Sequence, residues 1–291
     1  MIHVVCVGDL MVDVLARLPG PLAPGSDTPA VVELSGGGAA ANVAAWLAAA
    51  GAHATFVGRV GDDAFGHRAI DELETGGVRT AITIDPDLPT GTCIVLVDPD
   101  GERTMIPSAG ANSASGAMTD LPGDADWLYV SGYPLLDAAA RPFALAALGY
   151  ARRRGWSVAV DAASAAPLAA VGAEGFLSWV GADVLLLANA AEARILTGLD
   201  EPAAAVQALA RRCGRAIVKC GGAGAVWSDG SDTHSVAAIE STIVDSTGAG
   251  DAFAAGFLAA GGDVTARLRA AVALAARAVV QPGARPSPPR A

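Results

Sequence analysis

Short apolar runs alternate with longer alanine-rich stretches along most of the chain. Six of the apolar runs have the length and composition of buried strands: residues 4–8, 55–58, 127–131, 157–161, 184–187 and 216–219. Four of the alanine-rich stretches have the length and composition of helices: residues 39–50, 64–76, 137–154 and 202–213. This alternation predicts an α/β fold with a mainly parallel sheet and helices on both faces. In such sheets ligands bind beyond the carboxyl ends of the strands.

Two segments interrupt that rhythm. Residues 14–35 contain short extended pieces around a Pro/Gly-rich stretch, and residues 92–97 and 103–107 flank the turn signal Asp98-Pro-Asp-Gly101. These pieces predict a small second sheet, with the later pair forming a hairpin. We expect one domain over residues 1–291. The Pro-rich tail at 281–289 by itself predicts a frayed terminus.

Composition narrows the functional classes. The net charge of −11 disfavours nucleic-acid binding, which depends on Lys and Arg neutralising phosphates. Lys219 is the single lysine, so backbone N–H groups and arginines must supply most of any phosphate site. The four cysteines have no zinc spacing. With no basic leader and no apolar window of about 18 residues, we expect a cytoplasmic protein without membrane contacts.

The most informative segment is Asp245-Ser-Thr-Gly-Ala-Gly-Asp251, which precedes a helix with Phe253 and Phe257 on one face. Gly248, Ala249 and Gly250 then fall at the helix N-terminus, where open backbone N–H groups and the helix dipole attract anions. Asp251 lies where a carboxylate can accept the proton of an attacking hydroxyl during phosphoryl transfer. The alternative is a Gly-rich turn with Asp251 as an ordinary helix cap.

A second Gly-rich segment, Ser35-Gly-Gly-Gly-Ala-Ala-Ala-Asn42, leads into the helix expected at 39–50. Its glycines imitate a dinucleotide fingerprint, but they do not follow the first strand and the next strand does not end in an acid. Glycines also let backbone amides approach a sugar, with Asn42 offering donors and acceptors. Asp13 can accept hydroxyl hydrogen bonds, although alone it is typical of a solvated loop.

Two further segments each allow two interpretations. Asn189-Ala-Ala-Glu192 follows a strand, and its oxygens suit Mg²⁺ bound through water, although by itself the pattern is more typical of a helix cap with an acid in the first turn. The segment from Lys219 to Gly224 is a strand that runs into a Gly-rich turn. It lacks the spacing of a Walker A loop, and it forms either the edge of a nucleotide pocket or a simple hairpin.

Taken together, these motifs resemble the ribokinase-like (PfkB) carbohydrate kinases over essentially the whole chain. The N-terminal signature is Gly36-Gly-Gly-Ala-Ala-Ala-Asn-Val-Ala44, followed by Gly51 and by Phe56-Val-Gly-Arg-Val-Gly-Asp-Asp-Ala-Phe-Gly66. The C-terminal signature runs from Asp245 to Asp251. The resemblance implies a three-layer α/β/α fold with a β-sheet lid at about 14–35 and 91–107. It also implies transfer of the γ-phosphate of MgATP to a hydroxyl group, usually of a sugar.

The resemblance also implies roles for individual residues. Asp251 matches the catalytic base, and the anion hole is matched by Gly248, Ala249 and Gly250. The substrate ligands are matched by Asp13, Gly37, Gly38 and Asn42. The nucleotide and Mg²⁺ positions are matched by Asn189, Glu192, Lys219, Gly221 and Gly224. A monovalent-cation site of ribokinases is matched by Asp245, Thr247, Gly283 and Ser287, which leaves K⁺ open as a cofactor and an ordered tail as the alternative to a frayed one.

The substrate stays open at this level. A nucleobase favours aromatic stacking, and residues 9–41 and 91–112 contain no Phe, Tyr or Trp, which favours a sugar over a nucleoside. Tyr133 is the one aromatic residue that opposes this interpretation, and the acidic sugar contact of ribokinases has no counterpart at Gly132-Tyr133. A non-catalytic nucleotide-binding module and a Rossmann oxidoreductase are the more distant alternatives. A homodimer through the lid is a further expectation.

Overall fold

The computed structural model describes residues 1–99, 103–114 and 121–287. Its larger sheet consists of β1 (His3–Val7), β4 (His53–Gly61), β5 (Arg79–Asp85), β8 (Trp127–Val130), β9 (Ser157–Asp161), β10 (Val184–Asn189), β11 (Gly214–Lys219), β12 (Ala225–Ser228) and β13 (Thr233–Val236). Their order is β13-β12-β11-β10-β9-β8-β1-β4-β5. The strands from β11 to β5 run parallel, and β12 pairs antiparallel with both β11 and β13. All six predicted strands are therefore confirmed.

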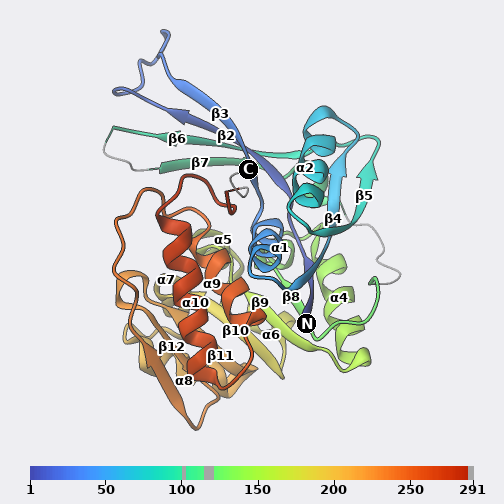
Figure 1. The fold of residues 1–291 in the computed structure, drawn as a ribbon, viewed down its shortest axis with the longest axis vertical. Coiled ribbons are helices and arrows are strands. Elements are labelled where there is room, and N and C mark those ends of the chain that lie inside the picture. Colours follow the sequence, from blue (N-terminus) through green and yellow to red (C-terminus); the bar gives the residue numbers. More distant parts are fainter. Residues whose placement is uncertain (100–102, 115–120, 288–291) are drawn as a thin grey trace.

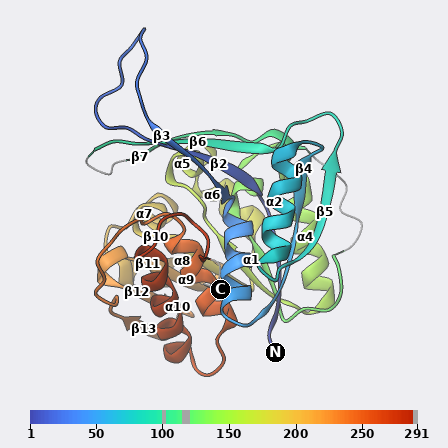
Figure 2. The ribbon, with the colours of Figure 1, turned by 45° about the horizontal axis from the view of Figure 1, so that its top comes forward.

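Helices cover both faces of this sheet, as Figures 1 and 2 show. In β1 the side chains of Val4 and Cys6 join one buried cluster, whereas Val5 and Val7 join the other, because successive side chains of a strand point to opposite faces. The first cluster is covered by α1 (Ala39–Ala49), α2 (Ala64–Thr75), α9 (Ala249–Ala259) and α10 (Val264–Val279). The second is covered by α3 (Gly132–Leu136), α4 (Arg141–Arg154), α5 (Ala165–Val171), α6 (Ala173–Val180), α7 (Ala190–Thr197) and α8 (Pro202–Cys213). The result is the expected three-layer α/β/α arrangement.

A separate four-stranded sheet forms the lid. It consists of β2 (Met11–Arg17), β3 (Val31–Gly37), β6 (Gly91–Val97) and β7 (Arg103–Ser108), in the order β3-β2-β6-β7. The hairpin predicted around 98–101 is confirmed by the antiparallel pairing of β6 with β7, although residues 100–102 lie outside the described part. Because β1 leads almost directly into β2, the lid lies across the carboxyl end of the main sheet (Figure 1).

One prediction about local structure was wrong, and one pair of alternatives is decided by the structure. The helix expected from residue 137 begins at Arg141, because the Asp137 side chain accepts hydrogen bonds from the backbone N–H groups of Ala139 and Ala140 and turns the chain there. The tail is not frayed over residues 281–287. Ala284 is 2 % exposed, and its carbonyl accepts a hydrogen bond from the Trp46 indole at 2.9 Å. Residues 288–291 lie outside the described part.

Candidate active site

Among the described residues, no side chain accepts a hydrogen bond from the backbone N–H groups at the start of α9, and only the N–H of Ala249 has a nearby backbone partner, the Ser246 carbonyl at 3.3 Å. The N-cap of α9 is Gly248, which has a left-handed backbone with φ of 74°. A β-carbon on Gly248 would lie 2.3 Å from the carbonyl oxygen of Ala284, so glycine is required both by conformation and by space. Phe253 and Phe257 of α9 are buried, as predicted. The tail therefore packs directly against an open helix N-terminus of the kind that binds anions.

Asp251 lies in the first turn of α9 and contacts the other signature motif. Its Oδ2 atom accepts a hydrogen bond from the Asn42 Nδ2 group at 2.9 Å, although the two residues are 209 positions apart. Asn42 lies in the first turn of α1, which packs beside α9. Asp251 is thus not the cap of its own helix, and its carboxylate faces the Gly-rich start of α1.

The surroundings of Asp251 suit a base that works near neutral pH. Burial raises the pKa of Asp251 to about 7. The hydrogen bond from Asn42 and the charge of Lys219 oppose this rise, whereas the carboxylates of Asp161 and Asp9 add to it. A pKa close to the working pH favours general-base catalysis, because the group is then both ionised and a competent proton acceptor.

The expected substrate ligands gather on the lid side of Asp251. Asp13, on β2, is 8 % exposed, and burial raises its pKa to about 6. A β-carbon on Gly37 would lie 2.2 Å from Oδ1 of Asp13, so the glycine makes room for that carboxylate. Gly38 has a φ of 91°, and a β-carbon there would lie 2.5 Å from the carbonyl oxygen of Asp9, so glycine is required at this position too. The structure brings Asp13, Gly37, Gly38 and Asn42 together.

Asp9 is a site residue that sequence reasoning missed. Its Oδ2 atom accepts a hydrogen bond from the backbone N–H of Ala39 at 2.7 Å, at the start of α1. A protein carboxylate therefore already occupies the anion-attracting end of α1, and Asp9 is 6 % exposed. Its position directly after the first strand was the available signal, because polar residues at the carboxyl ends of parallel strands meet at one edge.

Lys219, at the end of β11, contacts a second carboxylate that was missed. Its Nζ atom lies 2.6 Å from Oδ2 of Asp161, which ends β9. Burial disfavours the ammonium group, but the carboxylates of Asp161 and Glu192 outweigh that effect and raise the pKa of Lys219. A β-carbon on Gly250 would lie 3.3 Å from Nζ. The single lysine is therefore charged and lies directly beneath the open start of α9.

Asn189 and Glu192 form a capping box at the start of α7. The Asn189 side chain accepts from the backbone N–H of Glu192 at 2.9 Å, and Glu192 accepts from the backbone N–H of Asn189 at 2.7 Å. Glu192 is 2 % exposed, and burial together with the charge of Asp161 raises its pKa. Within the described residues, no three His, Cys, Asp or Glu side chains gather as a metal site. Mg²⁺ would therefore need ligands from water and from a bound phosphate chain.

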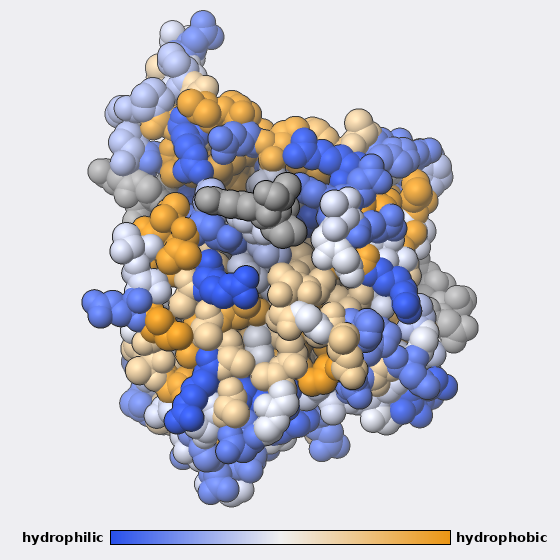
Figure 3. Space-filling view, in the orientation of Figure 1, coloured by the Kyte–Doolittle hydropathy of each residue, from blue (hydrophilic) through white to orange (hydrophobic). Residues whose placement is uncertain are grey.

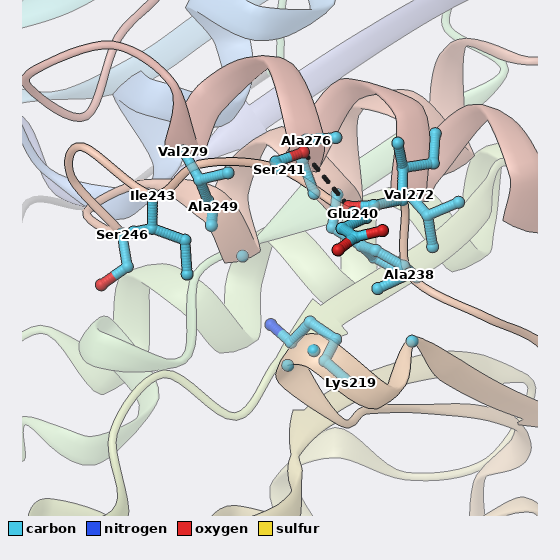
Figure 4. A pocket seen from close by; sticks show the side chains of 17 residues that line it. Lys219, Ala238, Glu240, Ser241, Ile243, Ser246, Ala249, Val272, Ala276 and Val279 are labelled. Atoms are coloured by element: carbon cyan, nitrogen blue, oxygen red, sulfur yellow. Dashed lines mark hydrogen bonds between the residues drawn. The ribbon is translucent and has the colours of Figure 1, made fainter.

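A cavity of ≈ 480 Å³ opens at the start of α9, beside Lys219. Lys219, Gly221 and Gly224 line it together with Ala249 and Gly250, whereas Asn189 is not among its lining residues. Figure 4 shows Lys219 reaching from the floor of the cavity toward Ala249, with Ala238, Glu240 and Val272 further along. The 3₁₀ turn η2 (Gly221–Ala223) forms its edge. An apolar cleft that ends at open N–H groups and an ammonium suits a molecule with a flat apolar part and a phosphate chain.

The four expected cation ligands are only partly united. The Asp245 carboxylate accepts hydrogen bonds from the backbone N–H groups of Thr247 at 2.7 Å and Gly283 at 3.0 Å. Ser287 instead donates to the side chain of Gln281 at 3.0 Å. The guanidinium of Arg103, on the lid strand β7, lies 2.7 Å from Oδ1 of Asp245 and also contacts the Thr247 hydroxyl. Burial alone would raise the pKa of Asp245, but the hydrogen bonds from Gly283 and Thr247 and the charge of Arg103 outweigh it and hold this pKa below its usual value.

Arg285, in the tail, is the third site residue that sequence reasoning missed. Its guanidinium donates to the Gly37 carbonyl at 2.8 Å, to Asn42 Oδ1 at 3.2 Å and to Glu72 Oε2 at 3.3 Å. Its side chain is 12 % exposed. The sequence held no signal for this position, because a lone arginine in a Pro-rich tail looks like a solvated terminus.

Comparison with known proteins identifies the family. The model of the pfkB family carbohydrate kinases matches residues 1–291, and the chain belongs to this family. It is 33 % identical over 266 residues to a fructokinase from Escherichia coli, covering 87 % of this chain and 82 % of that one. It is 32 % identical over 295 residues to an ATP-dependent ribose-1-phosphate kinase from Halopiger xanaduensis, covering 99 % and 95 % of the two chains.

Solved structures agree with this assignment. A probable sugar kinase from Rhizobium etli superposes with a TM-score of 0.87 at 26 % identity, over 98 % of this chain and 95 % of that one. A fructokinase from Vibrio cholerae, solved with fructose, ADP and a potassium ion bound, superposes with a TM-score of 0.78 at 25 % identity, over 98 % and 94 %. The chain is thus a carbohydrate kinase with a ribokinase-like fold, and kinases of this family use ATP. Family membership excludes the oxidoreductase and non-catalytic interpretations. In the described residues, no helix is both long and apolar enough to cross a membrane.

Proposed function

We propose that this kinase transfers the γ-phosphate of MgATP to a hydroxyl group of a small sugar, with Asp251 as the general base. The observation that carries the proposal is the 2.9 Å hydrogen bond between Asn42 and Asp251. It joins the Gly-rich segment suited to a sugar to the Gly-rich helix start suited to a phosphate. A hydroxyl group held between Asp13 and Asn42 lies next to the carboxylate that accepts its proton.

Each element of the site has one task in this proposal. Asp251 accepts the proton from the hydroxyl group as the oxygen attacks the phosphorus atom. The backbone N–H groups at Gly248, Ala249 and Gly250 stabilise the charge that develops on the transferred phosphoryl oxygens. Lys219, held in its charged form by Asp161, adds positive charge beneath that helix start. The protein thus supplies positioning and charge in a site largely shielded from water.

The cavity beside Lys219 is the proposed nucleotide site. Its lining combines the glycine turn at Gly221 and Gly224 with apolar side chains of α9 and α10. The adenine ring would lie against the apolar part, and its phosphates would point toward the start of α9. Glu192 would act on Mg²⁺ through water, and Asn189 would act by holding Glu192 in place through the capping box.

A monovalent cation remains a proposed second cofactor. Asp245 has the charge that such an ion requires, and a related fructokinase was solved with a potassium ion bound. The guanidinium of Arg103 already balances the Asp245 carboxylate, however. A bound K⁺ would therefore share this carboxylate with Arg103 or displace it. Tail residues Gly283 and Ser287 would complete the site with oxygen ligands.

A sugar substrate follows from two observations. The relatives named above act on fructose and on ribose 1-phosphate by their descriptions. The lid strands that face the site carry no aromatic side chain for stacking. We expect a coupled ADP-release assay to show turnover with one of ribose, fructose, ribose 1-phosphate or a ketodeoxy sugar acid. Turnover with none of these sugars and with adenosine instead would overturn the sugar assignment.

A nucleoside is the second candidate, and Tyr133 is the observation in its favour. This residue is 41 % exposed on α3, and the charges of Asp9, Asp251 and Asp161 act on its hydroxyl group, so it borders the site. An exposed aromatic ring at this edge could stack on a base. Replacement of Tyr133 by Ala should leave sugar turnover largely unchanged but should strongly raise the KM for a nucleoside.

The outer face of the lid is the proposed contact surface of a homodimer. On the face of the lid opposite Asp13, four apolar side chains of β3, β6 and β7 are each more than a third exposed: Val32, Leu34, Ile94 and Ile106. Figure 3 shows hydrophobic side chains gathered over the lid at the top of the molecule. A second copy of the same apolar sheet is a partner of matching chemistry. Light scattering at micromolar concentration should give twice the mass of one chain; a single-chain mass would refute this assembly.

A further inference from the structure

Arg285 reaches from the tail into the contact between the two signature motifs. Its Nε–H group donates to Oδ1 of Asn42 at 3.2 Å, and the Nδ2 group of the same amide donates to Asp251 at 2.9 Å. A guanidinium can only donate hydrogen bonds, so the Asn42 atom that faces it must be the oxygen. The orientation of the amide is therefore set by Arg285, and the NH₂ group must face Asp251.

We propose that Arg285 is a positioning residue for the general base: it holds the Asn42 amide in the orientation that accepts Asp251 only as a carboxylate. An amide that could rotate would suit both protonation states of Asp251. It could donate to a carboxylate through NH₂, or accept from a carboxylic acid through oxygen. Arg285 removes the second option and thereby keeps the base ready to accept a proton.

The tail is held firmly enough for this task. The carbonyl of Ala284 accepts from Trp46 at 2.9 Å and packs on Gly248, and Arg285 is held on its other side by the Gly37 carbonyl and by Glu72. A β-carbon on Gly36 would lie 2.1 Å from Nη1 of Arg285. Gly36 therefore leaves the space that the guanidinium fills, which gives the first glycine of the signature a function in this chain.

Several other charged groups surround this contact. Asp251 is faced by Asp161 from β9, Lys219 from β11 and Asp9 from the end of β1, and its charge acts on the hydroxyl groups of Tyr129 and Tyr133. Arg285 is faced by Glu72 from α2 and Asp13 from β2. Arg285 is thus a cation on the lid side of Asp251, and its charge acts in the same direction as its effect through Asn42. Both favour the ionised base.

The proposal rests on Asp251 as the base, and its test follows the pH dependence of kcat/KM. In Arg285→Met the acidic limb of the profile should move to higher pH by on the order of one unit, because the ionised base loses support. Arg285→Lys keeps the positive charge but lacks the planar guanidinium with its several N–H donors. Its acidic limb should therefore lie between those of the wild type and Arg285→Met. Arg194→Met is the matched control, since Arg194 is an exposed arginine paired with Asp200. The position of the limb is independent of how much enzyme is folded.

Two further variants test the route through Asn42. Gly36→Ala should shift the acidic limb in the same way while Arg285 is kept, because the added methyl group displaces the flexible guanidinium. In the double variant Gly36→Ala/Arg285→Met, the limb should move no further than in Arg285→Met alone. In an Asn42→Ala background, Arg285→Met should cause a much smaller shift than in the wild type. The proposal would be overturned if Arg285→Met left the acidic limb of the pH profile unchanged. It would also be overturned if Arg285→Met shifted the limb equally in the wild type and in the Asn42→Ala background. If Asp251→Asn kept full turnover, the proposed base itself would fail instead.

Discussion

Two Gly-rich segments each lead into a helix that packs on the same face of the sheet, yet they present opposite chemistry. Before α1, the glycines Gly36, Gly37 and Gly38 are closely enclosed by Arg285, Asp13 and the Asp9 backbone. The first N–H group of α1 is already satisfied by the Asp9 carboxylate. Before α9, none of the side chains that the structure describes caps the helix, and its N-terminus opens toward Lys219 and a cavity.

The difference shows that a Gly-rich helix start is not by itself a phosphate site. The dipole and the free N–H groups exist at every helix N-terminus. What decides the use of each start is whether a carboxylate from elsewhere in the fold has already filled it. At α1 this is Asp9, and the glycines instead make room for the side chains of Arg285 and Asp13. At α9 the start stays open for an anion.

The largest expected effect comes from the carboxylate at the open helix start. Asp251→Asn keeps the shape of the side chain but cannot accept a proton, so kcat should fall by roughly 10²–10⁴-fold while ATP binding remains nearly intact. Steady-state kinetics and ATP titration of the purified variant measure both quantities. Turnover like that of the wild type would remove Asp251 from the role of base.

Filling the open start should also be costly. In Gly248→Ala the methyl group would collide with the Ala284 carbonyl, and alanine is strained at a φ of 74°. We expect a stability loss of about 1–3 kcal/mol and a fall in kcat, because both the helix start and the tail must shift. Thermal melting and kinetics give the two values. Gly261→Ala, at an open position beyond the other end of α9, is the control and should change neither.

The pH dependence of the wild type checks the environment of the proposed base. An ordinary aspartate ionises near pH 3.8, and burial raises the pKa of Asp251 to about 7. The carboxylate is therefore lost as the pH falls below that value, so kcat/KM should drop about tenfold per pH unit on the acidic side. Measurements from about pH 5 to pH 9 at fixed ionic strength suffice. A profile that stays flat down to about pH 5 would show that Asp251 does not titrate as the base.

A third helix start, that of α7, is closed by its own residues. In Glu192→Gln the side chain keeps its length but loses its charge, so more Mg²⁺ should be needed for the half-maximal rate, by several-fold. The control is Glu201→Gln, because Glu201 caps α8 through the backbone N–H groups of Ala203 and Ala204. If both variants titrate with Mg²⁺ like the wild type, Asn189 and Glu192 are only a capping box.

The smallest expected effect concerns the carboxylate beside the open start. Asp245 is balanced by Arg103 from the lid, so the wild type should respond only weakly to K⁺. In Arg103→Met the carboxylate is left without its cation, and K⁺ should then raise kcat more than Na⁺ or tetramethylammonium does, at matched ionic strength. Equal rates of this variant in all three salts would exclude a monovalent cation at Asp245.

Much of the fold and part of the site could be predicted from local patterns. Apolar runs such as the one in β1 identify buried strands, because a strand covered on both faces needs apolar side chains on both. The order of the motifs along the chain indicated the family. The Asp245–Asp251 motif predicted an open helix start with Asp251 beside it. These features depend on residues within one turn or one strand of each other, which a sequence pattern records directly.

The remaining features were decided by contacts between distant segments. Asn42 meets Asp251 across 209 positions, Arg285 meets Asn42 across 243, and Arg103 meets Thr247 across 144. Asp9 and Asp161 acquire their roles only because parallel strands bring their carboxyl ends to one edge. No local pattern encodes such pairs, since each partner looks like an ordinary loop or tail residue until packing removes it from water. The sequence thus determined the class of enzyme and pointed to Asp251, whereas the packing of α1, α9, the lid and the tail decided which groups surround that carboxylate.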